Sequence, residues 1–98
     1  MNQKTDEARI SKTVTVVNPE GVHMRPAYMF ADMANQYSSD IEVTKDGQSV
    51  DGKSIMGIMM LAASEGSELT IGAHGDDAEQ ALVSLSELVA SGFAGKKE

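Results

Sequence analysis

The chain has 98 residues and a formal net charge of −7, with 41% hydrophobic and 23% charged residues. This length fits one domain with a single modest core, and the proportions are those of ordinary globular proteins. The acidic balance argues against non-specific nucleic-acid binding, which depends on basic residues. The absence of cysteine excludes disulfides, thiolate metal sites and thiol redox centres, and favours the cytosol. Because no apolar run resembles a signal peptide or a bilayer span, we expect no membrane insertion.

The first half of the chain predicts a strand, a helix and a hairpin. Residues 13–18 are rich in β-branched side chains and end in a turn cluster, which predicts a strand. Pro26 lacks a backbone N–H and fits the first turn of a helix, which apolar residues at helical spacing extend to Tyr37. Residues 41–44 alternate as in a strand, and the following Asp46-Gly47 pair predicts a hairpin turn before a third strand over residues 48–51.

The second half predicts two helices separated by a strand. Ser54 precedes a short apolar segment, residues 55–63, that predicts a short helix. Residues 69–73 alternate and predict a fourth strand. The segment from Asp76 to Glu79 resembles a capping box, so it predicts the start of a last helix. That helix has apolar residues on one face and ends at Gly92. The order β-α-β-β-α-β-α predicts an α+β, two-layer sandwich with an antiparallel sheet on one side.

Residues 21–27, Gly-Val-His-Met-Arg-Pro-Ala, place His23 and Arg25 where a loop becomes a helix. The unpaired N–H groups of a first helical turn and the helix dipole favour an anion there, and Arg25 adds a forked donor. A neutral imidazole nitrogen can attack phosphorus near pH 7, which makes His23 a candidate phosphoryl acceptor. On residue type alone, such a histidine is more often a surface residue or a satisfied polar group.

The same residues 21–27 resemble the active-site signature of the HPr family, the histidine-containing phosphocarriers of the phosphoenolpyruvate-dependent sugar phosphotransferase system. A second segment resembles the family's regulatory serine motif, with Gly47-Gln48, Lys53-Ser54-Ile55-Met56-Gly57-Ile58 and Leu61-Ala62. Two motifs in the correct order are more specific than either alone. Met24 stands where the family usually has a small residue, and Tyr28 is also bulkier than expected.

The resemblance implies a carrier that is not an enzyme and needs no cofactor. His23 would accept a phosphoryl group from Enzyme I and pass it to EIIA-type acceptor domains, while Arg25 stabilises the phosphate. Ser54 would be the target of an HPr kinase/phosphorylase, although a serine before an apolar helix is most often an N-cap. The family positions that match Ile55, Met56 and Met59 help to form the docking surface, to which Met24 would add apolar contact.

The resemblance also implies a bacterial, cytoplasmic, monomeric phosphoprotein with a sheet in the order 1-4-2-3 and three helices on one face. We expect one HPr-like domain over residues 1–98, with a core over 13–91 and flexible ends at 1–11 and 93–98. The second histidine, His74, is predicted to be exposed and structural, and two histidines do not make a metal site. Two alternatives stay open: an HPr-like regulator in nitrogen-related or metabolic signalling, and a module that binds an anionic metabolite without covalent chemistry.

Overall fold

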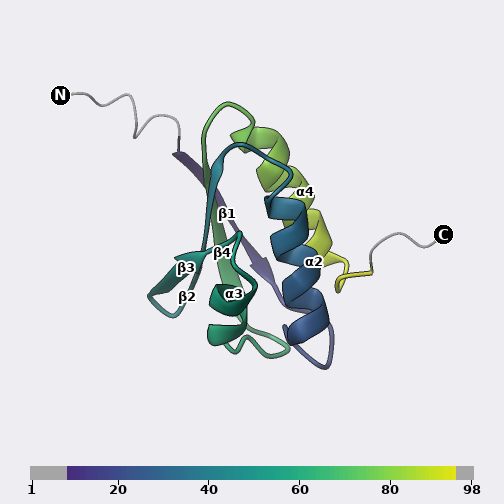
Figure 1. Ribbon diagram of the computed structural model, residues 1–98. Coiled ribbons are helices and arrows are strands. Elements are labelled where there is room, and N and C mark those ends of the chain that lie inside the picture. The colour runs from purple at the N-terminus through teal and green to yellow at the C-terminus, as the bar shows by residue number, and fades with distance from the viewer. Residues whose placement is uncertain (1–8, 95–98) are drawn as a thin grey trace.

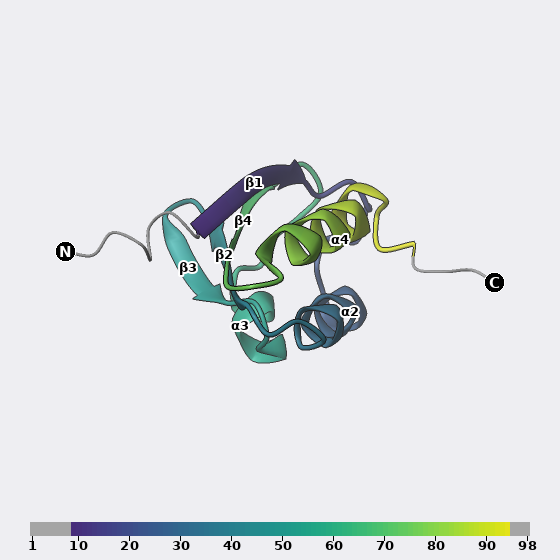
Figure 2. The ribbon, with the colours of Figure 1, turned by 90° about the horizontal axis from the view of Figure 1, so that it is seen from above.

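The computed structural model describes residues 9–94, which form four strands and three helices. Their order along the chain is β1 (Arg9–Thr15), α2 (Met24–Ala34), β2 (Asp40–Lys45), β3 (Gln48–Asp51), α3 (Ile55–Met60), β4 (Glu68–His74) and α4 (Ala78–Ala90). The strands pair antiparallel in the order β1-β4-β2-β3. All three helices cover the same face of this sheet (Figure 1 and Figure 2). The predicted α+β open-faced sandwich and its strand order are therefore confirmed.

The two faces of the sheet differ in polarity. On the face beneath the helices, Ile41, Val43 and Ile71 are each at most 3% exposed. On the open face, the hydroxyls of Thr13 and Thr70 are hydrogen-bonded across neighbouring strands at 2.9 Å. The period-two alternation predicted for these strands thus separates a buried face from a solvated one.

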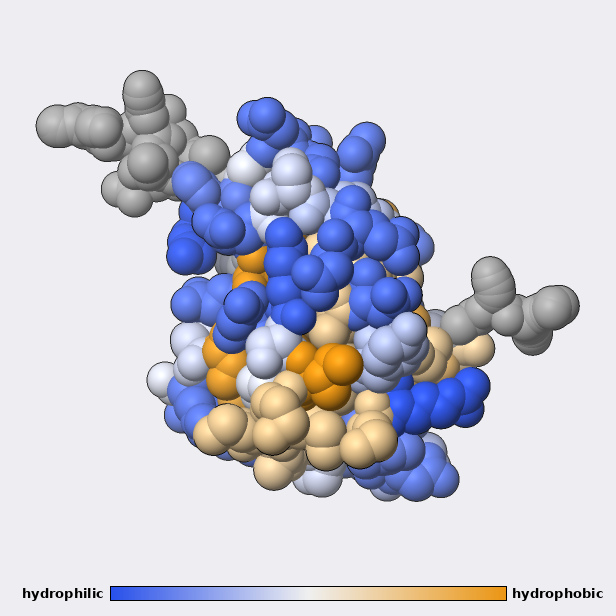
Figure 3. Space-filling model, viewed as in Figure 1, coloured by the Kyte–Doolittle hydropathy of each residue, from blue (hydrophilic) through white to orange (hydrophobic). Residues whose placement is uncertain are grey.

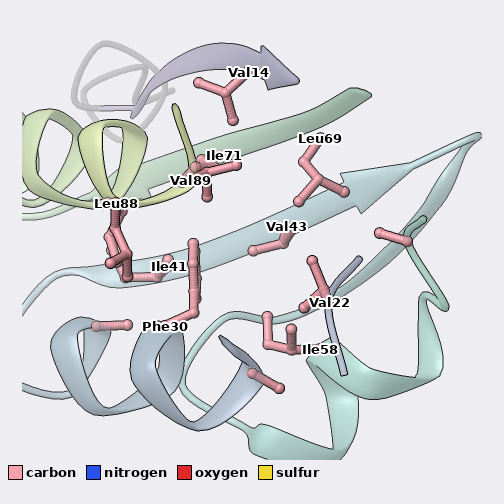
Figure 4. Close-up of a cluster of buried hydrophobic side chains, with 14 of the residues drawn as sticks. Val14, Val22, Phe30, Ile41, Val43, Ile58, Leu69, Ile71, Leu88 and Val89 are labelled. Atoms are coloured by element: carbon pink, nitrogen blue, oxygen red, sulfur yellow. The ribbon is translucent and has the colours of Figure 1, made fainter. Parts of the chain in front are cut away.

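The hydrophobic core fills the layer between the helices and the sheet. Figure 4 shows Phe30 of α2, Ile71 of β4 and Val89 of α4 among the side chains of this layer. Phe30 is 2% exposed, and Ile71 and Val89 are fully buried. The apolar positions predicted at helical spacing are buried within α2 and α4. The first helix is shorter than predicted, because α2 ends at Ala34 and Tyr37 lies beyond it, only partly buried. The core consequently fixes the start of α2 relative to the sheet and to α3.

The predicted capping box at the start of α4 is wrong, because the N-cap is Asp77 and not Asp76. The Asp77 carboxylate does not cap its own helix. It accepts hydrogen bonds from the backbone N–H groups of Ser38 and Ser39 at 2.9 and 3.0 Å, and from the Ser39 hydroxyl at 2.6 Å. Ser39 is only 1% exposed, so its donors need a partner within the protein. The carboxylate therefore ties the loop before β2 to the start of α4.

Several boundaries also differ from the prediction. β1 begins at Arg9, because residues 9–12 continue the ladder with β4 although their side chains are mostly polar. α3 ends at Met60 and not near residue 63, because Ala62 has a left-handed backbone conformation with φ 50°. Gly92 ends α4 as predicted, with φ 74°, and Phe93 beyond it is buried in the core.

The predicted core of residues 13–91 is therefore too short at both ends, since residues 9–11 lie in β1 and Phe93 is 8% exposed. The remaining parts of the predicted flexible ends, 1–8 and 95–98, lie outside the described residues. Among residues 9–94, no helix combines the length and the apolar character needed to cross a membrane.

Candidate functional site

The loop between β1 and α2 is held against the turn that follows α3. Gly21 has φ 72°, and a Cβ atom at this position would lie 2.6 Å from the carbonyl oxygen of Ala63. The backbone N–H of Val22 donates to the same oxygen at 2.8 Å. The side-chain amide of Asn18 donates to the Gly21 carbonyl at 2.7 Å. Only glycine allows this close approach with a positive φ, and the result is a fixed backbone immediately before His23.

His23 is the N-cap residue of α2. Its backbone is extended, with φ −100° and ψ −158°, and its carbonyl oxygen accepts a hydrogen bond from the Ala27 N–H at 2.9 Å. The imidazole is exposed and makes no capping hydrogen bond to the helix. The ring is therefore presented to solvent at a fixed point of the fold, where it can meet a group carried by another protein.

The first helical turn beside His23 has free hydrogen-bond donors. Met24, Arg25 and Pro26 form the first turn of α2, and Pro26 has no backbone N–H. Within the described part of the chain, neither Met24 nor Arg25 donates its N–H to a backbone carbonyl. The first turn contains no acidic residue, and the ion pairs found over residues 9–94 do not involve the exposed Arg25. An anion beside His23 would meet two backbone donors, the positive end of the helix dipole and a guanidinium.

A hollow of about 580 Å³ opens beside the imidazole and is lined by His23, Met24, Arg25, Tyr28 and Ile55. Apolar side chains continue from it along α3. We call the five exposed members of this surface the apolar patch: Met24, Tyr28, Ile55, Met56 and Met60. In Figure 3 the lower part of the molecule shows a continuous area of apolar residues. A surface of this kind beside a reactive group is suited to contact with a protein partner.

The structure separates the predicted partner-contact residues into two groups. Met24, Ile55 and Met56 belong to the apolar patch, whereas Met59 is partly buried and packs against the core. Tyr28 is an addition to the predicted set; this residue is 54% exposed and lines the hollow. Its position four residues after Met24 is the sequence signal for this placement, because residues four apart share one face of a helix.

Ser54 is the N-cap residue of α3, and its hydroxyl oxygen accepts a hydrogen bond from the Gly57 N–H at 3.0 Å. The N-cap interpretation of this serine is therefore confirmed. Asn35, just after α2, donates its side-chain amide to the Lys53 carbonyl at 3.0 Å. The Lys53 ammonium donates to the Tyr37 carbonyl at 2.8 Å. These contacts tie the start of α3 to the end of α2, and they place Ser54 one residue before a side chain that lines the hollow.

The other ionisable groups do not gather into a second site. His74 ends β4 on the partly exposed side of the sheet, opposite Arg9 and Asp40 in the strand register. This end of β4 lies away from the loop that carries His23, since the other end of β4 pairs with Thr15. Over the described residues, no group of three or more histidine, aspartate or glutamate side chains is placed to hold a metal ion.

Comparison with known proteins gives consistent matches. A family model for the PTS HPr component phosphorylation site matches residues 10–91. The HPr-like protein Crh of Bacillus subtilis is 42% identical over 80 residues, which cover 82% of this chain and 94% of Crh. The structure of the phosphocarrier protein HPr from Bacillus anthracis has a TM-score of 0.81 and 46% identity, covering 84% of this chain and 98% of that one. An HPr dimer from Thermoanaerobacter tengcongensis has a TM-score of 0.70 and 43% identity, covering 83% and 93%. The chain belongs to the HPr family of the phosphotransferase system, whose members are phosphocarriers and not enzymes.

Proposed function

We propose that this protein accepts a phosphoryl group on His23 from Enzyme I and passes it to EIIA-type acceptor domains. The observation that carries this proposal is the exposed imidazole at the N-cap of α2, with the free N–H groups of Met24 and Arg25 beside it. A transferred phosphoryl group needs a nucleophile that another protein can reach and donors that bind its oxygens. This site supplies both without enclosing the group.

The transfer step uses the lone pair of a neutral imidazole nitrogen of His23. A nitrogen–phosphorus bond forms while the bond between phosphorus and the donor breaks, and the donor keeps that electron pair. The backbone N–H groups and the Arg25 guanidinium bind the phosphoryl oxygens as charge develops on them. In the second transfer the nitrogen–phosphorus bond breaks in the same way. The exposure of His23 keeps the group within reach of the next acceptor.

Phosphorylation of Ser54 by an HPr kinase/phosphorylase would regulate this transfer. A phosphoserine adds about −2 charge units. Ser54 directly precedes Ile55, which lines the hollow beside His23. The added charge would therefore repel an acidic partner that docks on the apolar patch. Ser54→Asp should slow transfer from Enzyme I, whereas Ser49→Asp on the open face of the sheet is the matched control. Equal transfer rates for Ser54→Asp and the wild type would refute this regulation.

The proposed carrier acts in the cytoplasm as a monomer. One chain supplies His23 and the other residues that line the hollow beside it, so transfer needs no second copy. Light scattering at the concentrations used for transfer should give the mass of one chain. A dimer mass would instead place this protein with the dimeric form known for the T. tengcongensis HPr.

A regulatory role is the second candidate, and the 42% identity to the HPr-like protein Crh favours it. Such a protein would act through contacts of the apolar patch, with Ser54 as the modified residue. The two roles differ at His23. A carrier loses its function in His23→Ala, whereas a regulator that depends on Ser54 keeps its partner binding in that variant.

The direct test is to incubate the protein with Enzyme I and phosphoenolpyruvate and to measure its intact mass. We expect the gain of one phosphoryl group that is lost in acid and stable in base. His23→Ala should not be labelled, whereas the matched variant His74→Ala should be. If a known HPr is labelled in parallel and this protein is not, the carrier proposal is wrong, and a regulator or an anion-binding module takes its place.

A further inference from the structure

We propose that Met24, Met56 and Met60 form a peroxide-sensitive modification site, and that their oxidation to methionine sulfoxide slows transfer at His23. The order in which the methionines are oxidised follows from their exposure alone. The effect on transfer rests on the proposed function of His23.

The methionines of this protein fall into two classes. Six of them lie within the described residues. Met24, Met56 and Met60 are 65%, 69% and 66% exposed. The other three are partly buried and pack against the core, namely Met29, Met33 and Met59. Because an oxidant in solution must reach the sulfur atom, the first class should react before the second.

The exposed methionines are gathered at the reactive end of the molecule. Met24 directly follows His23 and lines the same hollow. Met56 follows Ile55, another lining residue, and Met60 lies one helical turn further along α3. These three methionines are thus the unbranched, adaptable side chains of the apolar patch. Such thioethers suit a surface that binds several partners by repacking.

Oxidation would change this surface without changing its shape greatly. A sulfur lone pair attacks one oxygen of hydrogen peroxide, the oxygen–oxygen bond breaks, and water leaves after proton transfer. The sulfur is oxidised to a sulfoxide and the peroxide is reduced, so the step is balanced with peroxide as the only oxidant. The product is polar and chiral, which weakens apolar contact, and methionine sulfoxide reductases restore the thioether.

The first experiment measures where the oxygen atoms enter. The folded protein is treated with hydrogen peroxide, and peptides are analysed by mass spectrometry over time. We expect Met24, Met56 and Met60 to be oxidised about fivefold faster than the three partly buried methionines, since access to the sulfur limits the rate. Oxidation of Met29, Met33 or Met59 at an equal or higher rate would overturn the assignment.

The second experiment measures transfer from Enzyme I before and after peroxide treatment, with each protein compared with its own untreated sample. Oxidised wild type should transfer about tenfold more slowly at concentrations below saturation, because docking is weakened. Both classes of sulfoxide reductase together should restore the rate. The variant Met24→Leu, Met56→Leu, Met60→Leu keeps an apolar surface of similar volume and should resist inactivation. The matched variant Met29→Leu, Met33→Leu, Met59→Leu should be inactivated like the wild type.

The outcomes separate this proposal from the carrier function. If the untreated protein accepts no phosphoryl group from Enzyme I, the carrier function and the control of transfer both fail, while the peptide masses still decide the modification site. If the untreated protein is labelled and the fully oxidised patch leaves transfer unchanged, the carrier function stands and the control of transfer is refuted. If both Leu variants lose activity equally on oxidation, the sensitive group lies outside the patch methionines.

Discussion

Replacing Gly21 by alanine should destabilise the protein by about 2–3 kcal/mol. The backbone there has φ 72°, and a left-handed conformation costs an alanine about 1–2 kcal/mol. The new Cβ atom would lie 2.6 Å from the Ala63 carbonyl oxygen and 2.9 Å from the Ser64 Cα, so the two segments must separate. Separation weakens the hydrogen bond of 2.8 Å from the Val22 N–H to Ala63, worth about 1 kcal/mol.

Gly47→Ala is the matched control for this prediction. Gly47 has φ 83°, and a Cβ atom there would have no other atom within 4 Å. This variant should therefore lose only the conformational contribution of about 1–2 kcal/mol. Urea unfolding gives the unfolding free energy of both variants. The slope of this free energy against urea concentration should equal that of the wild type, which checks that the denatured state is unchanged. If both variants lost the same unfolding free energy, the contact of a Cβ atom at position 21 with Ala63 would cost nothing, and the prediction would be refuted.

The same substitution should also affect the site. The contacts of Gly21 and Val22 hold the backbone that presents His23 as the N-cap of α2. Gly21→Ala should slow phosphoryl transfer even under conditions in which the variant is folded, because the ring and the donors of the first helical turn lose their fixed relation. Gly47→Ala should transfer at the wild-type rate. A normal rate for folded Gly21→Ala would mean that this loop does not position His23.

Three further substitutions test the structure. Ser54→Ala removes the N-cap hydrogen bond from the Gly57 N–H and should lower the unfolding free energy in urea by about 1 kcal/mol. An unchanged urea midpoint would show that this cap does not stabilise the protein. Ser86→Ala removes a buried hydroxyl that has no partner among the described residues, so it should raise the thermal midpoint; a lower midpoint would contradict this. The hydrogen bond from the Ser39 hydroxyl, followed by that from the Ser38 N–H, lowers the pKa of Asp77 below its ordinary value of 3.8. The ionised carboxylate therefore stabilises the fold above about pH 5, and this stabilisation is lost as the pH falls through the lowered pKa. The difference in unfolding free energy between the wild type and Asp77→Asn should be present at pH 7 and shrink toward pH 3, and a gap that does not change with pH would contradict the lowered pKa.

Local patterns were sufficient to predict most elements of the fold. The Asp46-Gly47 turn is an example, because two consecutive residues with positive φ match the twist of a hairpin. Pro26 likewise indicated the first turn of α2 from its own covalent structure. The strand order β1-β4-β2-β3 depends on which strands meet in space, and it followed only from the family resemblance.

Features that depend on distant partners were predicted less well. Aspartate is a residue type that often caps a helix. The Asp77 carboxylate instead accepts hydrogen bonds from Ser38 and Ser39, which lie about forty residues earlier in the sequence. Strand pairing similarly extends β1 back to Arg9, where the local sequence is polar.

In the candidate site, too, local sequence predicted some features, whereas others depend on packing between distant segments. His23 and Arg25 were predicted as site residues from their own motif, and the structure places both at the exposed start of α2. The contribution of Tyr28 and Ile55 to one hollow needed the packing of α2 beside α3, which no local pattern contains.

The most direct test of the account is a ¹H–¹⁵N NMR spectrum of the protein before and after phosphorylation by Enzyme I and phosphoenolpyruvate. In the proposed carrier, the first turn of α2 binds the phosphoryl group on His23. The amide signals of Met24 and Arg25 should then shift most strongly and downfield, because their free N–H groups acquire a charged acceptor. His23→Ala should show none of these shifts. If the largest shifts instead fell around His74 and left Met24 and Arg25 unchanged, the proposed phosphate site would be wrong.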